Sequence, residues 1–228
     1  MLAPLQQGGE PHRIAYCSPM ASAEQTPPYR IVTDRLVLRC YDPADAPLVH
    51  DAVDSSLDHL RPWMPWSQAS TSLDETIALL RRFRGQFDFG EDSIYGVFAP
   101  DGSEVVGGAG LHPRVAPGGL EIGYWIRASR TGAGLATEAA AALTRVAIEL
   151  CGVDRVEIHV DPANAASLAI PRKLGYQEEA TLRRRLPPVD PSGPARDDVV
   201  FSLLAEELAG SPAAEAAFEA FDAAGRRI

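Results

Sequence analysis

A glycine-rich turn that joins an apolar strand to a long amphipathic helix narrows the possible folds of this chain more than any other feature. The strand signal spans 122–126, the turn spans Arg130–Thr137, and one face of the helix carries Leu135, Ala139, Leu143, Val146 and Leu150. Glycines let the backbone approach a ligand closely, and the N-terminus of the helix contributes a partial positive charge. This arrangement predicts an anion-binding site, most often one for phosphate.

The surrounding pattern predicts an α/β domain with a mixed sheet. Strand periodicity recurs at 33–39, 94–99, 105–111, 120–126, 153–160, 175–182 and 199–204, and helical periodicity at 42–53, 72–87, 135–150 and 165–174. Short turns such as Asp101-Gly102 predict antiparallel neighbours, whereas the helix after 126 requires one parallel pair. Ser72 and Glu75 have the spacing of a capping box. We expect a central, mostly antiparallel sheet of seven strands flanked by about four helices.

The two ends of the chain are expected to lie outside this domain. Residues 1–28 contain prolines and glycines without periodicity, which predicts a flexible tail. Residues 29–208 hold the domain, and residues 209–228 form an alanine-rich extension whose composition favours a helix. Within the domain, Pro171 cannot donate to the carbonyl of Ser167, so we expect the helix at 165–174 to kink or to end early.

Composition and charge exclude several classes of function. The chain has 228 residues and a formal net charge of −10. Nucleic-acid-binding domains usually carry a basic stripe, so no nucleic-acid partner is expected, and an acidic protein better suits a cationic small molecule or basic peptide. No apolar run is long enough for a membrane span, and no secretory leader is visible, which predicts a cytoplasmic protein.

The three cysteines do not form a pattern with a known chemistry. Cys17, Cys40 and Cys151 are widely spaced, odd in number and without a CxxC pair. We therefore expect no disulfide framework and no metal site, and we interpret Cys40 and Cys151 as small buried apolar residues.

The turn alone leaves two interpretations open: a tight connection without a ligand, or a ligand site. It is not a phosphate-binding P-loop, because no Gly-Lys-Ser/Thr ends it, and it lacks the spacing of a dinucleotide fingerprint. Taken with other segments, however, the chain resembles the GNAT acyltransferases, and in particular the RimJ/RimL-like branch, which acetylates protein N-termini or small amines. The resemblance covers about residues 33–206 and is carried by 60–66, 121–126, 131–139, 164–167, 173–176 and 197–203.

The resemblance implies that coenzyme A binds at the turn. Its pyrophosphate would be held by the backbone N–H groups of Gly132, Ala133, Gly134, Leu135, Ala136 and Thr137. Thr131 stands where the family usually has Arg or Gln, and the neighbouring Arg130 is a candidate replacement for that cation. Pantetheine amides would pair with the strand Tyr124, Trp125 and Ile126, with Asn164 near the pantetheine arm.

Acyl transfer to an amine needs a base for the amine proton, a donor for the oxyanion and an acid for the leaving thiolate. Many GNAT enzymes use as the acid a tyrosine seven residues after the asparagine, but that position is Pro171 here. We expect Ser167 to lie near the thioester sulfur and act as the acid; the alternative is a first-turn serine that satisfies backbone groups.

The general base is less well defined by the sequence. The position of the family's glutamate falls near Leu186, which cannot act. We place Glu121 first and His112 second, and the alternatives are a paired or exposed glutamate and a solvent-facing histidine. Asp190, Asp197 and Asp198 lie in or beside a variable loop and are further carboxylates within this region.

An acceptor and acyl pocket is expected at the proline-broken segment with Arg61, Trp63, Met64 and Trp66, which is either a packed lid or a pocket wall. Acetyl-CoA is the default donor, and succinyl-CoA is possible if Arg61 or His112 pairs with its carboxylate. The overall expectation is direct N-acyl transfer, without a metal, to a small-molecule amine or a protein N-terminus, by a possible homo-oligomer. The alternative is a CoA-sensing or protein-interaction module with lost catalysis.

Overall fold

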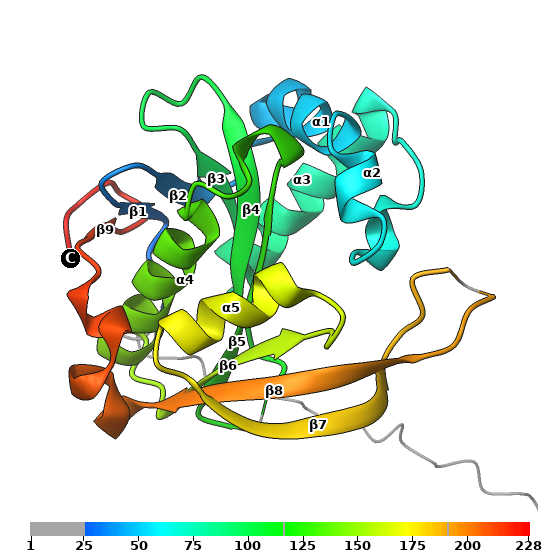
Figure 1. The fold of residues 1–228 in the computed structure, drawn as a ribbon. Helices are drawn as coiled ribbons and strands as arrows, with labels where there is room; N and C mark the ends of the chain where they lie inside the picture. The colour runs from blue at the N-terminus through cyan, green and yellow to red at the C-terminus, as the bar shows by residue number, and fades with distance from the viewer. Residues whose placement is uncertain (1–25, 116, 191) are drawn as a thin grey trace, which may run out of the picture.

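The computed structural model describes residues 26–115, 117–190 and 192–228. Within these residues nine strands form one sheet in the order β7-β8-β6-β5-β4-β3-β2-β1-β9 (Figure 1). The strands are β1 Arg30–Val32, β2 Val37–Cys40, β3 Ser93–Phe98, β4 Val105–His112, β5 Gly119–Ile126, β6 Arg155–Val160, β7 Gln177–Leu186, β8 Arg196–Leu204 and β9 Glu219–Phe221.

Helices cover both faces of the sheet, as expected from its two sets of buried side chains. The α-helices are α1 Ala46–Asp54, α2 Leu57–Leu60, α3 Leu73–Asp88, α4 Leu135–Arg145 and α5 Ala165–Lys173. In Figure 1, α4 and α5 lie in front of the sheet, while α1 and α3 lie behind it. One core cluster joins α4 and α5 to the sheet, and a second, built around Tyr41, Leu80 and Phe98, joins α1 and α3 to its other face.

The sheet opens between β5 and β6. These two strands are parallel and pair only from Gly119–Arg155 to Glu121–Glu157. Beyond Glu121, β5 continues in register with β4, whereas β6 continues with β8. The edge of β5 that faces β6 is therefore left without a strand partner over its second half, and an extended ligand can pair there.

Most predicted elements are present at their expected places. The capping box is confirmed, because Ser72 accepts from the N–H of Glu75 and the Glu75 carboxylate accepts from the N–H of Ser72. Gly102 has a φ of 71° in the turn between β3 and β4, as the Asp101-Gly102 signal predicted. The helix at 135–150 is α-helical only to Arg145 and ends in a π-turn, Val146–Leu150.

Three predictions about elements were wrong. The strand predicted at 33–39 begins only at Val37, as β2, and an additional strand, β1, precedes it. Between them the Thr33 N–H donates to the Leu36 carbonyl (2.9 Å), where the chain reverses. The C-terminal extension is not helical: after two 3₁₀ turns, Ala205–Gly210 and Pro212–Glu215, its strand β9 pairs with β1. The sheet therefore has two strands more than expected.

Pro171 does not end α5, which continues through it to Lys173. The Leu174 N–H bonds to the Ile170 carbonyl at 3.1 Å, so the early end that we expected is not observed. The missing N–H of Pro171 still leaves the Ser167 carbonyl without its usual helical donor.

The pairing of β9 with β1 makes the C-terminal segment part of the domain. Ala220 is 2% exposed and pairs with Ile31. Ala220→Lys is expected to lower the free energy of unfolding by about 2–4 kcal/mol, because it places an ammonium in the core. The control, Ala224→Lys at an exposed position, is expected to change it by no more than about 0.5 kcal/mol in urea unfolding. Equal, small effects of the two variants would contradict the pairing.

Candidate active site

The glycine turn forms an array of free backbone donors at the start of α4. Gly132 and Gly134 have φ values of 76° and 78°, which glycine adopts most readily, and Gly134 is the N-cap residue. The N–H groups of residues 132–137 make no hydrogen bond to the described part of the chain. Unpaired N–H groups at a helix N-terminus are suited to a phosphate.

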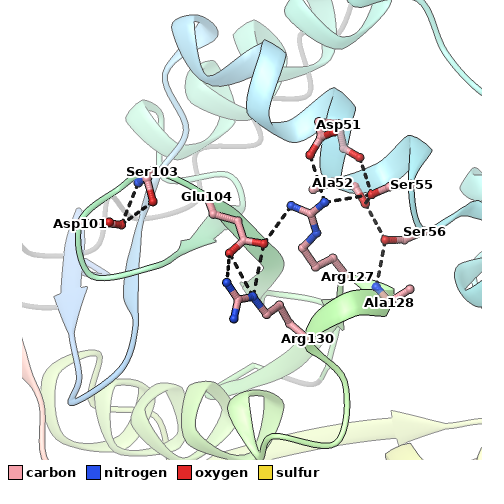
Figure 2. Close-up of polar contacts among 10 residues, drawn as sticks. All are labelled: Asp51, Ala52, Ser55, Ser56, Asp101, Ser103, Glu104, Arg127, Ala128 and Arg130. Atoms are coloured by element: carbon pink, nitrogen blue, oxygen red, sulfur yellow. Dashed lines mark hydrogen bonds and ion pairs between the residues drawn. The ribbon is translucent and has the colours of Figure 1, made fainter.

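Ion pairs hold the approach to this turn against α1 and the β3–β4 hairpin (Figure 2). The Arg127 guanidinium contacts Asp51 at 3.0 Å and Glu104 at 3.1 Å. The Arg130 guanidinium also lies on Glu104, with Nε 3.0 Å from Oε2. Arg130, which we considered as a replacement for the family's cation at Thr131, is therefore directed toward Glu104.

A cation at the turn comes instead from Arg35, on the connection between β1 and β2. Its Nη1 donates to the Ala133 carbonyl at 2.9 Å, and its Nε donates to the Glu138 carboxylate at 2.6 Å. Glu138 lies in the first turn of α4, where its negative charge would oppose that of a bound phosphate. Arg35 offsets this charge and fixes the turn. Sequence reasoning missed it because the two segments are 98 residues apart.

A cleft of about 620 Å³ lies beside the open end of the β5–β6 pair. It brings together nine of the nineteen expected site residues: Trp63, Met64, Trp66, His112, Glu121, Tyr124, Trp125, Asn164 and Ser167. Arg61, Ile126 and the turn residues 130–137 are not among its lining residues. Arg61 pairs with Asp58 at the surface (3.0 Å). The Trp63 segment is held in place by Arg196, which contacts the Trp63 carbonyl at 3.5 Å and Asp161 at 2.8 Å.

His112 ends β4 with its ring folded back over two glycines. A Cβ added at Gly110 would lie 2.5 Å from the imidazole, and one at Gly123 would lie 3.1 Å from Nε2. These glycines are register partners on β4 and β5, so their missing side chains make the space for the ring. Nδ1 lies 2.6 Å from Asp92 Oδ1. In a neutral imidazole this contact places the proton on Nδ1 and leaves the Nε2 lone pair available.

Glu121 lies opposite His112 on β5, on the same face of the sheet. Its carboxylate is 3.9 Å from the Arg114 guanidinium, which also lies 3.6 Å from Asp92. Glu121 is thus near a cation and His112 is held by a carboxylate. A carboxylate that holds Nδ1–H, as Asp92 does for His112, is the arrangement that orients a histidine as a base.

On the opposite face, Ser167 contacts a tyrosine. Its Oγ lies 3.1 Å from the Tyr124 hydroxyl, which is also 3.4 Å from the Ser167 carbonyl that Pro171 leaves free. Burial raises the pKa of Tyr124 to about 12, so the phenol stays protonated. The Ser167 N–H is capped by the Asn164 side chain at 3.1 Å. Ser167 Oγ is therefore engaged with Tyr124, and the backbone-capping role belongs to Asn164.

The three loop aspartates are occupied elsewhere. Asp190 accepts from Ser192, and Asp197 accepts from the backbone N–H of Arg184 at 2.8 Å. Asp198 is 1% exposed and lies 2.7 Å from His159 Nδ1. His159, which we did not predict, has its other nitrogen 2.7 Å from Glu157. The hydrogen bond to Asp198, aided by Glu157, raises the pKa of His159 to about 9, so it is a cation at neutral pH.

The described cysteines, Cys40 and Cys151, are buried free thiols, and burial raises their pKa values to about 11 and about 12. Cys17 lies outside the described residues. Among the residues that the structure covers, no group of three or more His, Cys, Asp or Glu side chains is placed to hold a metal ion. None of the described helices has the length and hydrophobicity that a membrane span requires.

The fold agrees with the comparison to known proteins. The model of the acetyltransferase (GNAT) domain matches residues 35–177, more than half of the chain. The protein therefore belongs to the GNAT family and is an acyl-CoA-dependent acyltransferase.

Within the family, the chain is similar to proteins named as ribosomal N-acetyltransferases. The chain is 30% identical over 190 residues to the putative ribosomal N-acetyltransferase YdaF of Bacillus subtilis, covering 78% of this chain and 96% of that protein. It is 28% identical over 160 residues to the ribosomal protein uS5-alanine N-acetyltransferase of Escherichia coli, covering 67% and 80% of the two chains. The structure matches RimJ of Mycobacterium smegmatis in complex with a CoA disulfide, with a TM-score of 0.73, 28% identity and coverage of 83% and 94%.

The bridge from His159 to Asp198 and Glu157 predicts a dependence of stability on pH. The pKa of His159 in the folded protein, about 9, exceeds the ordinary value of 6.5, so its contribution is complete below about 6.5 and is lost as pH rises through about 9. For this partly solvated group we expect a loss of about 1–2 kcal/mol. Urea unfolding between pH 6 and 9.5 measures it.

His159→Gln is the matched variant for this prediction. It is expected to be less stable than the wild type at pH 6 and to lose less stability than the wild type over the same range, because the group that titrates is gone. Parallel curves for the two proteins would contradict the assignment.

Proposed function

We propose that this protein transfers the acetyl group of acetyl-CoA to the N-terminal α-amine of a protein, and that ribosomal proteins are the acceptor class. The family supplies the coenzyme, and the relatives from Bacillus subtilis and Escherichia coli are named for ribosomal acceptors. The observation that carries the proposal is the placement of the two polar groups. The gap beyond Glu121 lies between His112 on one face of the sheet and the Tyr124–Ser167 pair on the other.

The coenzyme would lie along the free edge of β5, with its pyrophosphate on the N–H groups of residues 132–137. Arg35 supports this turn and offsets the charge of Glu138. The strand residues Tyr124, Trp125 and Ile126 would offer backbone groups to the pantetheine amides, and Asn164 caps the helix beside them. None of these interactions depends on the side chain of Thr131.

His112 is the base that the geometry supports best. The amine nitrogen loses a proton to His112 Nε2 as its lone pair forms the new bond to the acyl carbon. Asp92 holds Nδ1–H and stabilises the imidazolium that results. Collapse of the tetrahedral intermediate then breaks the carbon–sulfur bond. The thiolate takes a proton from Ser167 as Ser167 takes one from the Tyr124 hydroxyl, 3.1 Å away, and Tyr124 regains its proton from solvent.

Substitutions of His112 and Glu121 distinguish between the two candidate bases that the sequence offered. His112→Gln is expected to lower kcat/KM by about 10²–10⁴ and to remove the acidic limb of its pH profile, because proton acceptance is lost. Asp92→Asn is expected to lower kcat less and shift that limb. Release of free coenzyme A thiol, measured from pH 5.5 to 9.5, provides the readout. If Glu121→Gln removed the limb and His112→Gln kept it, Glu121 would be the base.

Substitutions of Ser167 and Tyr124, on the face of the sheet opposite His112, test the role of the general acid. Ser167→Ala is expected to lower kcat by about 10²-fold, with a smaller loss in Tyr124→Phe, while the KM for acetyl-CoA changes little. Ser167→Thr keeps the hydroxyl and is expected to retain more activity than the alanine variant. Equal losses in the threonine and alanine variants would indicate a packing effect.

The acyl donor and the acceptor are tested with a matrix of substrates. Acetyl-CoA and succinyl-CoA are compared with an N-terminal peptide, a lysine side-chain peptide and small primary amines. We expect turnover with acetyl-CoA and the N-terminal peptide. Turnover with succinyl-CoA would require a cation other than Arg61, which is not among the residues that line the cleft. Tight CoA binding without transfer to any acceptor would favour the CoA-sensing module.

A further inference from the structure

A basic segment lies at the mouth of the cleft, at the end of the edge strand β7. Arg183, Arg184 and Arg185 are all exposed, and among the described residues none of the three side chains has an ion-pair partner. Leu186 and Pro187, the next two residues, line the cleft, as does Arg196 on the facing strand. The three arginines therefore border the entrance to the proposed acceptor site.

The backbone at this place departs from a regular strand. Leu182 pairs with Asp198 and Leu186 with Arg196, so three arginines stand opposite the single residue Asp197. Arg184 has a φ of 53°, the only positive φ of a non-glycine residue in the described part of the chain. The Asp197 carboxylate accepts from its N–H at 2.8 Å and stabilises the bulge. Bulges re-aim side chains beside active sites, and strained conformations of this kind cluster at functional sites.

Protection of a sheet edge is the other role that exposed charges can have. The first half of β7 already carries charged residues, but these are paired: Glu178 with Arg172, and Glu179 with Arg155. Only the half that reaches the cleft carries unpaired charges, and all of them are positive. Protection of the sheet edge alone requires neither consecutive side chains of the same charge nor a β-bulge.

Cationic side chains also line the cleft, most of them paired with carboxylates. Arg82, Arg114 and Arg196 are among its lining residues, and His159 beside them is a cation at neutral pH, against the carboxylates Glu121 and Asp161. Arg114, Arg196 and His159 are paired with Asp92, Asp161 and Asp198, so the run of unpaired positive charge lies on Arg183–Arg185, a segment that the net charge of −10 for the whole chain does not describe. A cationic acceptor would meet unpaired arginines as it entered.

We propose that Arg183–Arg185 form a docking surface for an acidic segment of the acceptor protein, which follows the N-terminal residue that is acetylated. This inference rests on the proposed function, because it assumes a polypeptide acceptor. The acidic side chains pair with the arginines while the N-terminal amine lies in the cleft near His112. The segment is recognised by its charge, and the cleft recognises the terminal residue.

The experiment uses three peptides with the same first three residues, followed by a glutamate-rich, a serine/glutamine-rich or a lysine-rich segment. For the wild-type protein we expect the KM of the acidic peptide to be about 5- to 30-fold below that of the neutral one at low salt, and the difference to shrink with added salt. The lysine-rich peptide is expected to have the highest KM.

The variant Arg183→Gln/Arg185→Gln is expected to lose this preference and keep its kcat/KM for the neutral peptide. Arg184 is left in place because of its backbone contact. The control, Arg226→Gln/Arg227→Gln, removes the same charge next to β9, at the opposite edge of the sheet, and is expected to keep the preference. Gel filtration of each variant separates loss of docking from edge-to-edge association.

Two measurements keep failure of the docking surface apart from failure of the proposed function. Fluorescence anisotropy reports binding of the labelled peptides whether or not they are acetylated. Binding of the acidic peptide that depends on the arginines, without acetylation, would retain the docking surface and reject the N-terminal acceptor. The proposal would be overturned if all peptides had the same KM and the same affinity. It would also be overturned if the arginine variant kept its peptide preference but self-associated through the sheet edge, or if a single-stranded RNA bound more tightly than the acidic peptide.

Discussion

The short parallel contact between β5 and β6 is the constraint on which the rest of the site depends. Three residue pairs hold these strands together, and beyond Glu121 each strand follows a different neighbour. Backbone groups at the free edge of β5 must be satisfied by something other than a strand. In the function proposed above, the amide groups of the coenzyme meet this need, and the incomplete sheet provides the site.

The opening also places chemistry on both faces of one sheet. Alternation along β5 puts Glu121 and Gly123 on the face of His112, and puts Tyr124 on the face of α5 and Ser167. In the proposed mechanism, proton acceptance and proton donation take place on opposite sides of an acyl group held between the strands. Gly110 and Gly123 are part of this arrangement, since any side chain there would displace the imidazole.

Sequence reasoning found the elements whose signals are local. The turn at Arg130–Thr137, the capping box at Ser72 and the place of Ser167 on a helix after Asn164 all depend on residues within a few positions of one another. It failed where a contact between distant segments decides the structure. Asp92, Arg35 and His159 each act through a partner between 20 and 103 residues away or through the register of β6 on β8. The C-terminal strand was missed for the same reason, because β1 selects its conformation.

The sequence by itself determined the class of the protein: a mixed sheet, a glycine-rich turn at the start of a helix and the residues that resemble a GNAT acyltransferase. Periodicity and glycine placement are local properties of the chain and need no knowledge of its path in space. Only the tertiary structure decided which side chains work together, because strand register and the splay of β5 from β6 set the distances between them. It seats His112 against Asp92, directs Arg130 to Glu104, and brings three unpaired arginines to the mouth of the cleft.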